Sequence, residues 1–361
     1  MADAPLLSRR RLLQLAGLGG TLLGGAALGG CRGGSPLDPQ LLSVRGEMPA
    51  AWLKALPAPW RSRSLEAPQA LLEAAATPPA GPALLSLGDG WAQQLDRAQL
   101  QPLQAEGLLR QLAPLAAAPS RLFEAEGAPP LAFPWAFGTW LLLLRNRPDL
   151  QRRRAEGWQL LLDPSLRGKL VLPSSPRLVI ELALRQLGVA SGDPAASEDP
   201  RLPAQLRRLQ RQALALDERD GLNLLLSGDA EAAVVTSQRA IPLLQRDPRL
   251  TALLPAEGSP LWWQLLLRPA PAQTGQLQPA LPLEWLRDGL SLPLLDRLLA
   301  GGWVPPLPAE QLQPALARWP APLRPLLLPP AAVLARCNNL EPLTLAQRDR
   351  WQQLWDSALA A

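Results

Sequence analysis

The sequence predicts an α/β fold with mainly parallel sheets and enough chain for two lobes. Short apolar runs such as 83–87 and 232–235 alternate with segments of helical periodicity such as 177–187. This alternation is typical of parallel sheets covered by helices. The 361 residues exceed the length at which one hydrophobic core stops growing, about 250 to 300 residues. Apolar residues make up 47% of the chain, so packed cores are expected despite the 42 prolines.

The predicted elements follow one another in a regular order. Strands are expected at 41–44, 83–87, 140–145, 170–173, 232–235 and 263–267, and helices at 50–56, 91–95, 177–187, 202–213, 223–226, 283–290 and 293–299. In such sheets the loops after the strands form the ligand cleft. The loops at 45–48, 88–91, 173–178 and 236–239 therefore carry the candidate site.

Two of these loops contain helix-start signals. Ser175 precedes Pro176 and an apolar periodic run that ends at Gly188, so we expect Ser175 to be an N-cap whose helix points its free N–H groups at the cleft. Asp89 follows a predicted strand, where it can cap its own helix or contact a ligand.

Several function classes are excluded by composition. The chain contains no His and no Tyr. Ser-His-Asp and Cys-His catalysis, His-ligated zinc and sites built on a tyrosine phenolate are therefore excluded. We expect no enzyme, no cofactor and no metal site.

The first 30 residues resemble an export signal that ends in a lipidation site. Arg9 and Arg10 precede a glycine-rich, weakly apolar stretch at 15–28, as in twin-arginine signals. The Leu-Gly-Gly-Cys ending at Cys31 resembles a bacterial lipobox, which implies an acylated Cys31 and a membrane-tethered protein of the periplasm or cell envelope. The segment that follows is rich in Gly, Ser, Pro and Asp, which predicts a flexible stalk at 31–40. An uncleaved transmembrane anchor is the alternative.

The charge pattern argues against nucleic-acid binding. Removing residues 1–30 takes away three Arg and Asp3, so the net charge falls from +5 to about +3. The one basic run, 152–154, is short and is expected to be a solvated surface. Cys337 has no partner once Cys31 is acylated, so no disulfide is expected.

Four blocks of sequence, in order, resemble one protein family. They are Pro130 to Thr139, Gly157 to Lys169, Ser175 to Gly188, and Leu226 to Ala230 followed by Trp262 to Ala270. These blocks are similar to motifs of the polyamine-binding (spermidine/putrescine) branch of the extracellular solute-binding proteins that serve ABC importers. The resemblance extends from about residue 41 to 355.

The resemblance implies a type II periplasmic-binding-protein fold, in which two lobes close on a ligand in the cleft between them. It places one lobe at 41–136 and 264–300, the other at 137–263, and a C-terminal segment at 301–361 packed across both. Hinges are expected at 134–139 and 265–269. It also implies a monomer that delivers a small solute to an ABC permease in the membrane.

The ligand positions of the family match this chain in part. The resemblance puts Glu47 at a carboxylate position and Trp262 at an aromatic one, whereas Gln264, Ser175 and Leu178 stand where acids are expected, and Arg45 where an aromatic ring is expected. The full set of candidate ligand-binding residues is Glu47, Asp89, Trp91, Trp135, Ser175, Thr236, Trp262 and Gln264. Trp140, Trp263 and Trp303 are further candidates for the pocket wall, or fill the core.

Two hypotheses compete with polyamine binding. Each missing carboxylate leaves a buried ammonium without its partner, at a cost of about 3 to 5 kcal/mol. A zwitterionic or anionic solute is therefore the first alternative, with Arg45, Arg177 and Arg239 as its candidate contacts. A degenerate binding fold that serves as a protein-interaction module is the second.

Overall fold

The computed structural model describes residues 38–76, 83–189, 194–217, 220–271 and 279–359. The signal segment, Cys31 and most of the predicted stalk lie outside these residues. The described chain forms one compact unit that begins within the predicted stalk, and its first strand starts at Gln40, one residue before the predicted start. Within the described ranges, no helix is both long and apolar enough to cross a membrane.

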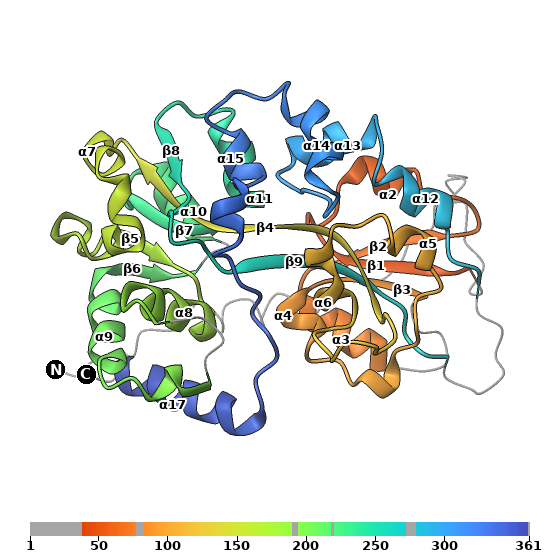
Figure 1. The fold of residues 1–361 in the computed structure, drawn as a ribbon, viewed down its shortest axis with the longest axis horizontal. Coiled ribbons are helices and arrows are strands. Elements are labelled where there is room, and N and C mark those ends of the chain that lie inside the picture. The colour runs from red at the N-terminus through yellow and green to blue at the C-terminus, as the bar shows by residue number, and fades with distance from the viewer. Residues whose placement is uncertain (1–37, 77–82, 190–193, 218–219, 272–278, 360–361) are drawn as a thin grey trace, which may run out of the picture. The chain divides into compact units, whose positions relative to one another are not determined.

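One mixed sheet of nine strands organises the molecule (Figure 1). Its strands are β1 (Gln40–Val44), β2 (Arg61–Leu65), β3 (Leu84–Gly88), β4 (Ala132–Arg145), β5 (Leu170–Leu172), β6 (Ala213–Leu216), β7 (Ala232–Thr236), β8 (Leu250–Leu253) and β9 (Leu261–Leu267). The order is β2-β1-β3-β9-β4-β7-β5-β6, with β8 also paired to β4. We call the part built on β1 to β3 the first lobe and the part built on β5 to β8 the second lobe.

Helices cover both lobes. They are α2 (Ala50–Lys54), α3 (Pro68–Ala76), α4 (Asp89–Ala92), α5 (Glu106–Leu109), α6 (Ala117–Ser120), α7 (Pro148–Arg152), α8 (Pro176–Gln186), α9 (Leu202–Gln212), α10 (Gly221–Ser227), α11 (Ser237–Leu244), α12 (Leu283–Asp288), α13 (Leu294–Ala300), α14 (Ala309–Leu316), α15 (Arg324–Leu327), α16 (Ala331–Leu334) and α17 (Leu345–Leu359). Short 3₁₀ segments are η1 (Arg97–Gln99), η2 (Pro114–Ala116), η3 (Arg154–Leu162), η4 (Pro164–Leu166) and η5 (Pro194–Glu198).

Two strands run antiparallel to their neighbours and connect the lobes. Residues 132–139 of β4 pair with β9, and residues 140–144 pair with β7 of the second lobe. β9 pairs with β3 of the first lobe through residues 264–267. Four strand pairings are parallel: β1–β2, β1–β3, β5–β6 and β5–β7. The other four all involve β4 or β9 and are antiparallel, so the prediction of mainly parallel sheets is wrong.

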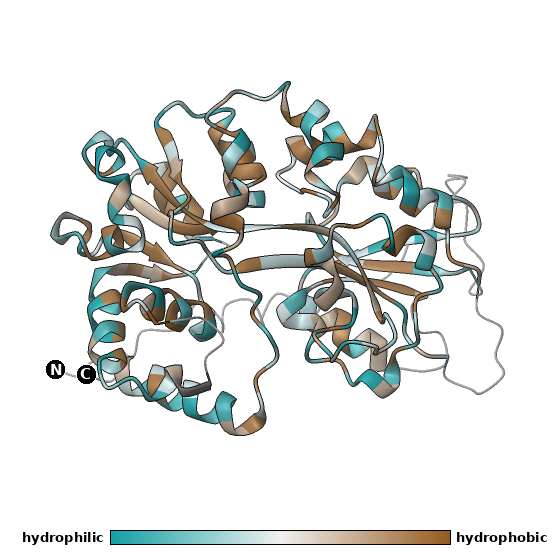
Figure 2. Ribbon diagram, in the orientation of Figure 1, coloured by the Kyte–Doolittle hydropathy of each residue, from teal (hydrophilic) through white to brown (hydrophobic). Residues whose placement is uncertain are grey.

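Each lobe has an apolar cluster of its own, and a third cluster extends through both lobes along the connecting strands. In the first lobe, Trp52 stacks on Trp285 with ring centroids 4.4 Å apart, and each indole N–H donates to the main-chain oxygen of the other residue. In the second lobe, Trp158, Val179 and Leu206 are fully buried under β5 and β7. Figure 2 shows hydrophobic residues concentrated along the strands and hydrophilic residues along much of α9 and α17.

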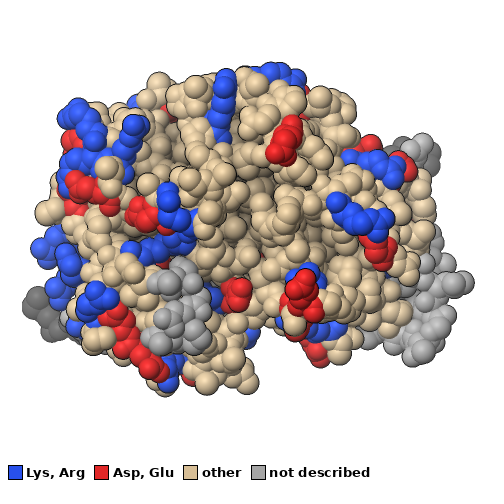
Figure 3. Space-filling model, viewed as in Figure 1, with Lys and Arg blue, Asp and Glu red and all other residues tan. Residues whose placement is uncertain are grey.

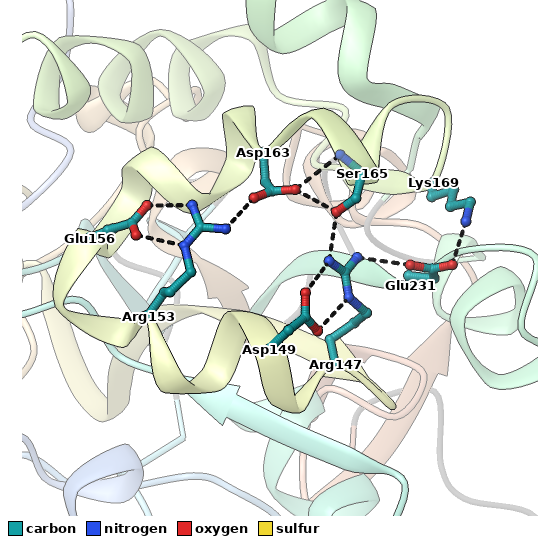
Figure 4. Close-up of polar contacts among 8 residues, drawn as sticks. All are labelled: Arg147, Asp149, Arg153, Glu156, Asp163, Ser165, Lys169 and Glu231. Atoms are coloured by element: carbon teal, nitrogen blue, oxygen red, sulfur yellow. Dashed lines mark hydrogen bonds and ion pairs between the residues drawn. The ribbon is translucent and has the colours of Figure 1, made fainter.

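A network of ion pairs fastens the segment between α7 and β5 of the second lobe (Figure 4). Arg147 donates to Asp149 at 2.7 Å and to Glu231 at 2.8 Å, and Arg153 donates to Glu156 at 2.7 Å. The predicted solvated run 152–154 is exposed. Figure 3 shows Lys and Arg gathered with Asp and Glu over the part that carries α7 and β5, whereas the middle of that face is mostly uncharged. Exposed pairs of this kind stabilise by about 0 to 1 kcal/mol each.

Candidate functional site

Two cavities meet beside the strands that connect the lobes. The larger has a volume of about 580 Å³ and the smaller about 190 Å³. Both are lined by Asp89, Trp91, Trp140 and Trp262. These four side chains come from α4, β4 and β9, so the start of a first-lobe helix and the two connecting strands form the junction between the cavities.

Asp89 is the acidic group at this junction. It is the first residue of α4, Gly88 is the N-cap, and only 8% of Asp89 is exposed. Its Oδ1 accepts a hydrogen bond from the main-chain N–H of Trp263 at 3.4 Å. Burial raises the pKa of this carboxyl to about 7, although the Trp263 hydrogen bond and the charge of Arg177 lower it. A cation that entered the cavity would favour the ionised form.

Two of the three aromatic side chains that line both cavities, Trp140 and Trp262, lie on the connecting strands, and the third, Trp91, lies on α4. Trp262 is nearly buried and donates from Nε1 to Ser237 Oγ at 3.3 Å. Its ring lies against Gly138 of β4, where a Cβ would come within 2.7 Å of Trp262 Cζ2. The same Cβ would meet Ser237 Oγ, the hydrogen-bond acceptor of Trp262 Nε1, even more closely, so glycine at 138 is required for the position of this ring. Trp91 and Trp140 are half-buried and present ring surface to the same space.

Glu47 lines the smaller cavity and contacts both lobes. It lies in the turn after β1, where Oε2 accepts from Gln264 Nε2 at 3.1 Å and Oε1 lies 3.5 Å from Arg239 Nη2. Arg239 belongs to α11 of the second lobe. Gln264 is 9% exposed, and its Oε1 has no hydrogen-bond partner among the residues that the structure describes. An amide in place of the expected acid thus leaves a buried acceptor at the cavity.

The second lobe contributes the start of α8 to the larger cavity. Ser175 is the N-cap of this helix and Pro176 its first residue, as predicted, but the Ser175 hydroxyl makes no capping hydrogen bond. Arg177 lies beside them. Burial lowers the pKa of its guanidinium, while the charges of Glu181 and Asp89 raise it.

The sequence matches no protein-family model and no curated protein. Solved structures of similar fold include the spermidine/putrescine substrate-binding protein PotD from Streptococcus pneumoniae (14% identity, TM-score 0.69, 89% of this chain and 98% of that one). An ABC transporter substrate-binding protein from Bradyrhizobium japonicum (14%, TM-score 0.65, 88% and 98%) and the TpPotD lipoprotein of Treponema pallidum (12%, TM-score 0.60, 89% and 98%) are also similar. The chain has the two-lobed periplasmic-binding-protein fold. At these identities the similarity is one of fold.

The fold brings together seven of the eight candidate residues. Glu47, Thr236 and Gln264 line the smaller cavity, Ser175 lines the larger one, and Asp89, Trp91 and Trp262 line both.

Trp135 is the candidate that lines neither cavity. It is 1% exposed, packs against Trp52 and donates from Nε1 to Ser86 Oγ at 3.2 Å. A register shift between Pro134 and Ala136 accompanies this inward position. Arg45 also lies outside both cavities, paired with Glu66 at 2.6 Å on the exposed surface. Asp89 is not an N-cap, because Gly88 has that position.

The C-terminal segment adds residues to the site that the sequence did not indicate. Leu340, Leu343, Arg348, Trp351 and Gln352 all line the larger cavity. No local motif marks them as ligand contacts. Their position follows from the way α17 packs on α8 and α9, which brings a segment distant in sequence beside Arg177.

Proposed function

We propose that this protein is the substrate-binding subunit of an ABC importer, of the polyamine-binding type, and that it captures a small polar solute through a protonated amine. The observation that carries the proposal is the Asp89 carboxyl at the junction of two cavities, with Trp91, Trp140 and Trp262 lining the same space. The fold supports capture by closure of the lobes around the connecting strands β4 and β9.

The chemistry of the junction suits an ammonium group. Aromatic faces attract a desolvated cation by about 2 kcal/mol or more, and a hydrogen bond to a charged group is worth about 1.5 to 3 kcal/mol. Burial disfavours the ionised form of Asp89, and the positive charge of a bound ammonium group would offset this effect. The N–H groups of an ammonium point in tetrahedral directions, so one could donate to the Asp89 carboxylate and another to Gln264 Oε1, which has no partner among the described residues.

The arrangement of acidic groups in the site favours strong binding of one ammonium group of the solute rather than two. Glu47 is already engaged by Gln264 and Arg239, and Ser175 and Leu178 at the start of α8 bring no charge. A diamine would therefore have one strong anchor at Asp89 and a weaker one near Glu47. We infer that an amine is required and that polyamines are one class of candidate solute.

The cellular setting that we propose rests on the N-terminal sequence. Arg9 and Arg10 would direct export, and acylation of Cys31 would tether the mature monomer to a membrane of the cell envelope. There it would deliver solute to a permease, without catalysing a reaction.

A thermal-shift panel of diamines, polyamines, amino acids and small anions tests this proposal. A ligand at 100 times its Kd stabilises a protein by about 2.7 kcal/mol, which is a readily measured shift. We expect shifts with amine-bearing compounds and their loss in Asp89→Asn. Asp96→Asn is the matched control, because Asp96 only caps η1 by accepting from Ala98 N–H at 2.9 Å. If no small molecule shifts the melting temperature, the interaction-module alternative is favoured.

A further inference from the structure

The C-terminal segment is fastened to both lobes beside the larger cavity. Gln93 of the first lobe donates to Leu340 O at 2.9 Å, and Trp263 Nε1 of β9 donates to Asn339 Oδ1 at 2.8 Å. Arg177 of the second lobe donates to Glu341 O at 2.6 Å. The segment is thus held on each side of the space that it lines.

Helix α17 continues from this segment onto the second lobe. Trp351 and Trp355 are nearly buried among the residues of the second-lobe core. Trp351 also faces the cavity, where the Arg177 guanidinium carbon lies 5.3 Å from its ring centroid. This packing fixes the turn of α17 that carries Arg348.

Arg348 is a second cationic side chain, beside Arg177, on the second-lobe side of the cavity. Its Nε donates to Leu343 O at 3.2 Å, and its two terminal nitrogens have no partner among the described residues. Arg177, by contrast, is shared with Glu341 O and lies 3.9 Å from the Glu181 carboxylate. The start of α8, with its uncapped N–H groups, lines the same wall. The second-lobe side of the cavity therefore favours an anion, whereas the first-lobe side favours a cation, because Asp89 lies there, close enough to Arg177 for the two charges to interact.

We propose that the larger cavity binds a linear zwitterion, with its ammonium at Asp89 and a carboxylate held by Arg348 and Arg177. This inference rests on the proposed function and names its substrate class. One singly charged anionic group fits better than a phosphate, because Arg177 is already engaged by neighbouring oxygens, whereas Arg348 has no carboxylate partner among the described residues. The planar guanidinium fork matches a carboxylate.

Isothermal titration calorimetry on the purified full chain tests the proposal with probes matched in length. The probes are the six-carbon and eight-carbon α,ω-diamines, ω-amino acids and dicarboxylates. We expect an ω-amino acid to bind at least tenfold more tightly than the diamine of the same length, and the dicarboxylates to bind more weakly than either.

Two variants of α17 then test whether Arg348 binds the carboxylate of the solute. Arg348→Gln should weaken the ω-amino acid about tenfold and leave the diamine unchanged or tighter. Arg350→Gln is the control on the same helix, because Arg350 pairs with Glu198 at 2.6 Å and lines neither cavity. The control should change nothing.

The outcomes separate this inference from the function on which it rests. If diamines bind as tightly as ω-amino acids, or if Arg348→Gln weakens both equally, the zwitterion proposal is wrong while amine capture stands. If only dicarboxylates bind, or if no probe binds, both proposals are wrong.

Discussion

The raised pKa of Asp89 predicts that an amine ligand binds much more weakly in acid. Burial gives this carboxyl a pKa of about 7, so near pH 5 it is almost entirely protonated. Binding an ammonium requires the ionised form, and each pH unit below the pKa then costs about 1.4 kcal/mol. Between pH 8 and pH 5 the affinity should fall by about 100-fold, or about 2.7 kcal/mol.

The arginines around Asp89 and the charged groups of the ligand keep their charge over this range. Arg177 faces Asp89 from α8, Arg348 lines the same cavity, and Glu47 and Arg239 line the adjoining one. Arginines do not titrate between pH 5 and 8, and aliphatic ammonium and carboxylate groups titrate outside it, near pH 10 and 4.

Calorimetry measures both consequences of this coupling. We expect the affinity to rise steeply from pH 5 to 7 and to level off by pH 8, with release of about one proton per ligand at pH 5, detected by using buffers of different ionisation enthalpy. Asp89→Asn should bind weakly and show no such slope. An affinity that changes less than threefold between pH 5 and 8, or a slope that persists in Asp89→Asn, would refute the reasoning.

Three further predictions follow from the same geometry and sequence. The pKa of Asp89 in the folded protein lies above its unfolded value of 3.8, so the contribution of this carboxyl to stability is present below about pH 4 and is lost as the pH rises through 7. Denaturant unfolding of the ligand-free protein should therefore show the free energy of unfolding of wild type falling by up to about 4 kcal/mol relative to Asp89→Asn over this pH range. The same pH dependence of the free energy of unfolding in both proteins would contradict a buried carboxyl at this position. Gly138→Ala should displace Trp262 and weaken ligand binding by tenfold or more, whereas Gly107→Ala, whose Cβ would meet open space, should bind normally in the same titration. Cys31→Ala should leave the protein as uncleaved precursor or release it from membrane fractions, and joint replacement of Arg9 and Arg10 by Lys should block export; wild-type processing in both variants would exclude the lipoprotein signal.

The sequence predicts most of the strands and the α/β architecture, because apolar runs that alternate with amphipathic helices can pack in few ways. Five of the six predicted strands correspond to β1, β3, β5, β7 and β9, and the sixth is the second half of β4. β2 was missed because its sequence, Arg-Ser-Arg-Ser-Leu, is exposed at the edge of the sheet and lacks an apolar alternation. β6 was also missed, because Ala213 to Leu216 continues directly from α9 without a break signal, and so was the four-residue strand β8.

The candidate site was predictable where it depends on strand ends and unpredictable where it depends on packing. Glu47 and Asp89 follow strands of the first lobe, and Thr236 ends a strand of the second lobe. The antiparallel pairings through β9 and β4 turn the strand ends of the two lobes toward each other, so the topology brings these residues together. Trp135 was misplaced because side chains alternate along a strand, and an irregularity beside Pro134 determines which face it takes. Arg348 could not be found, because nothing near it in sequence reveals that α17 lies against α8.

The most direct test of the central claim, that an amine-bearing solute is captured between two lobes through Asp89, is small-angle X-ray scattering of the protein with and without saturating ligand. Closure about the connecting strands should reduce the radius of gyration of wild type, and Asp89→Asn under the same conditions should show no change. An unchanged radius of gyration for wild type at a ligand concentration that calorimetry shows to be saturating would contradict capture by closure.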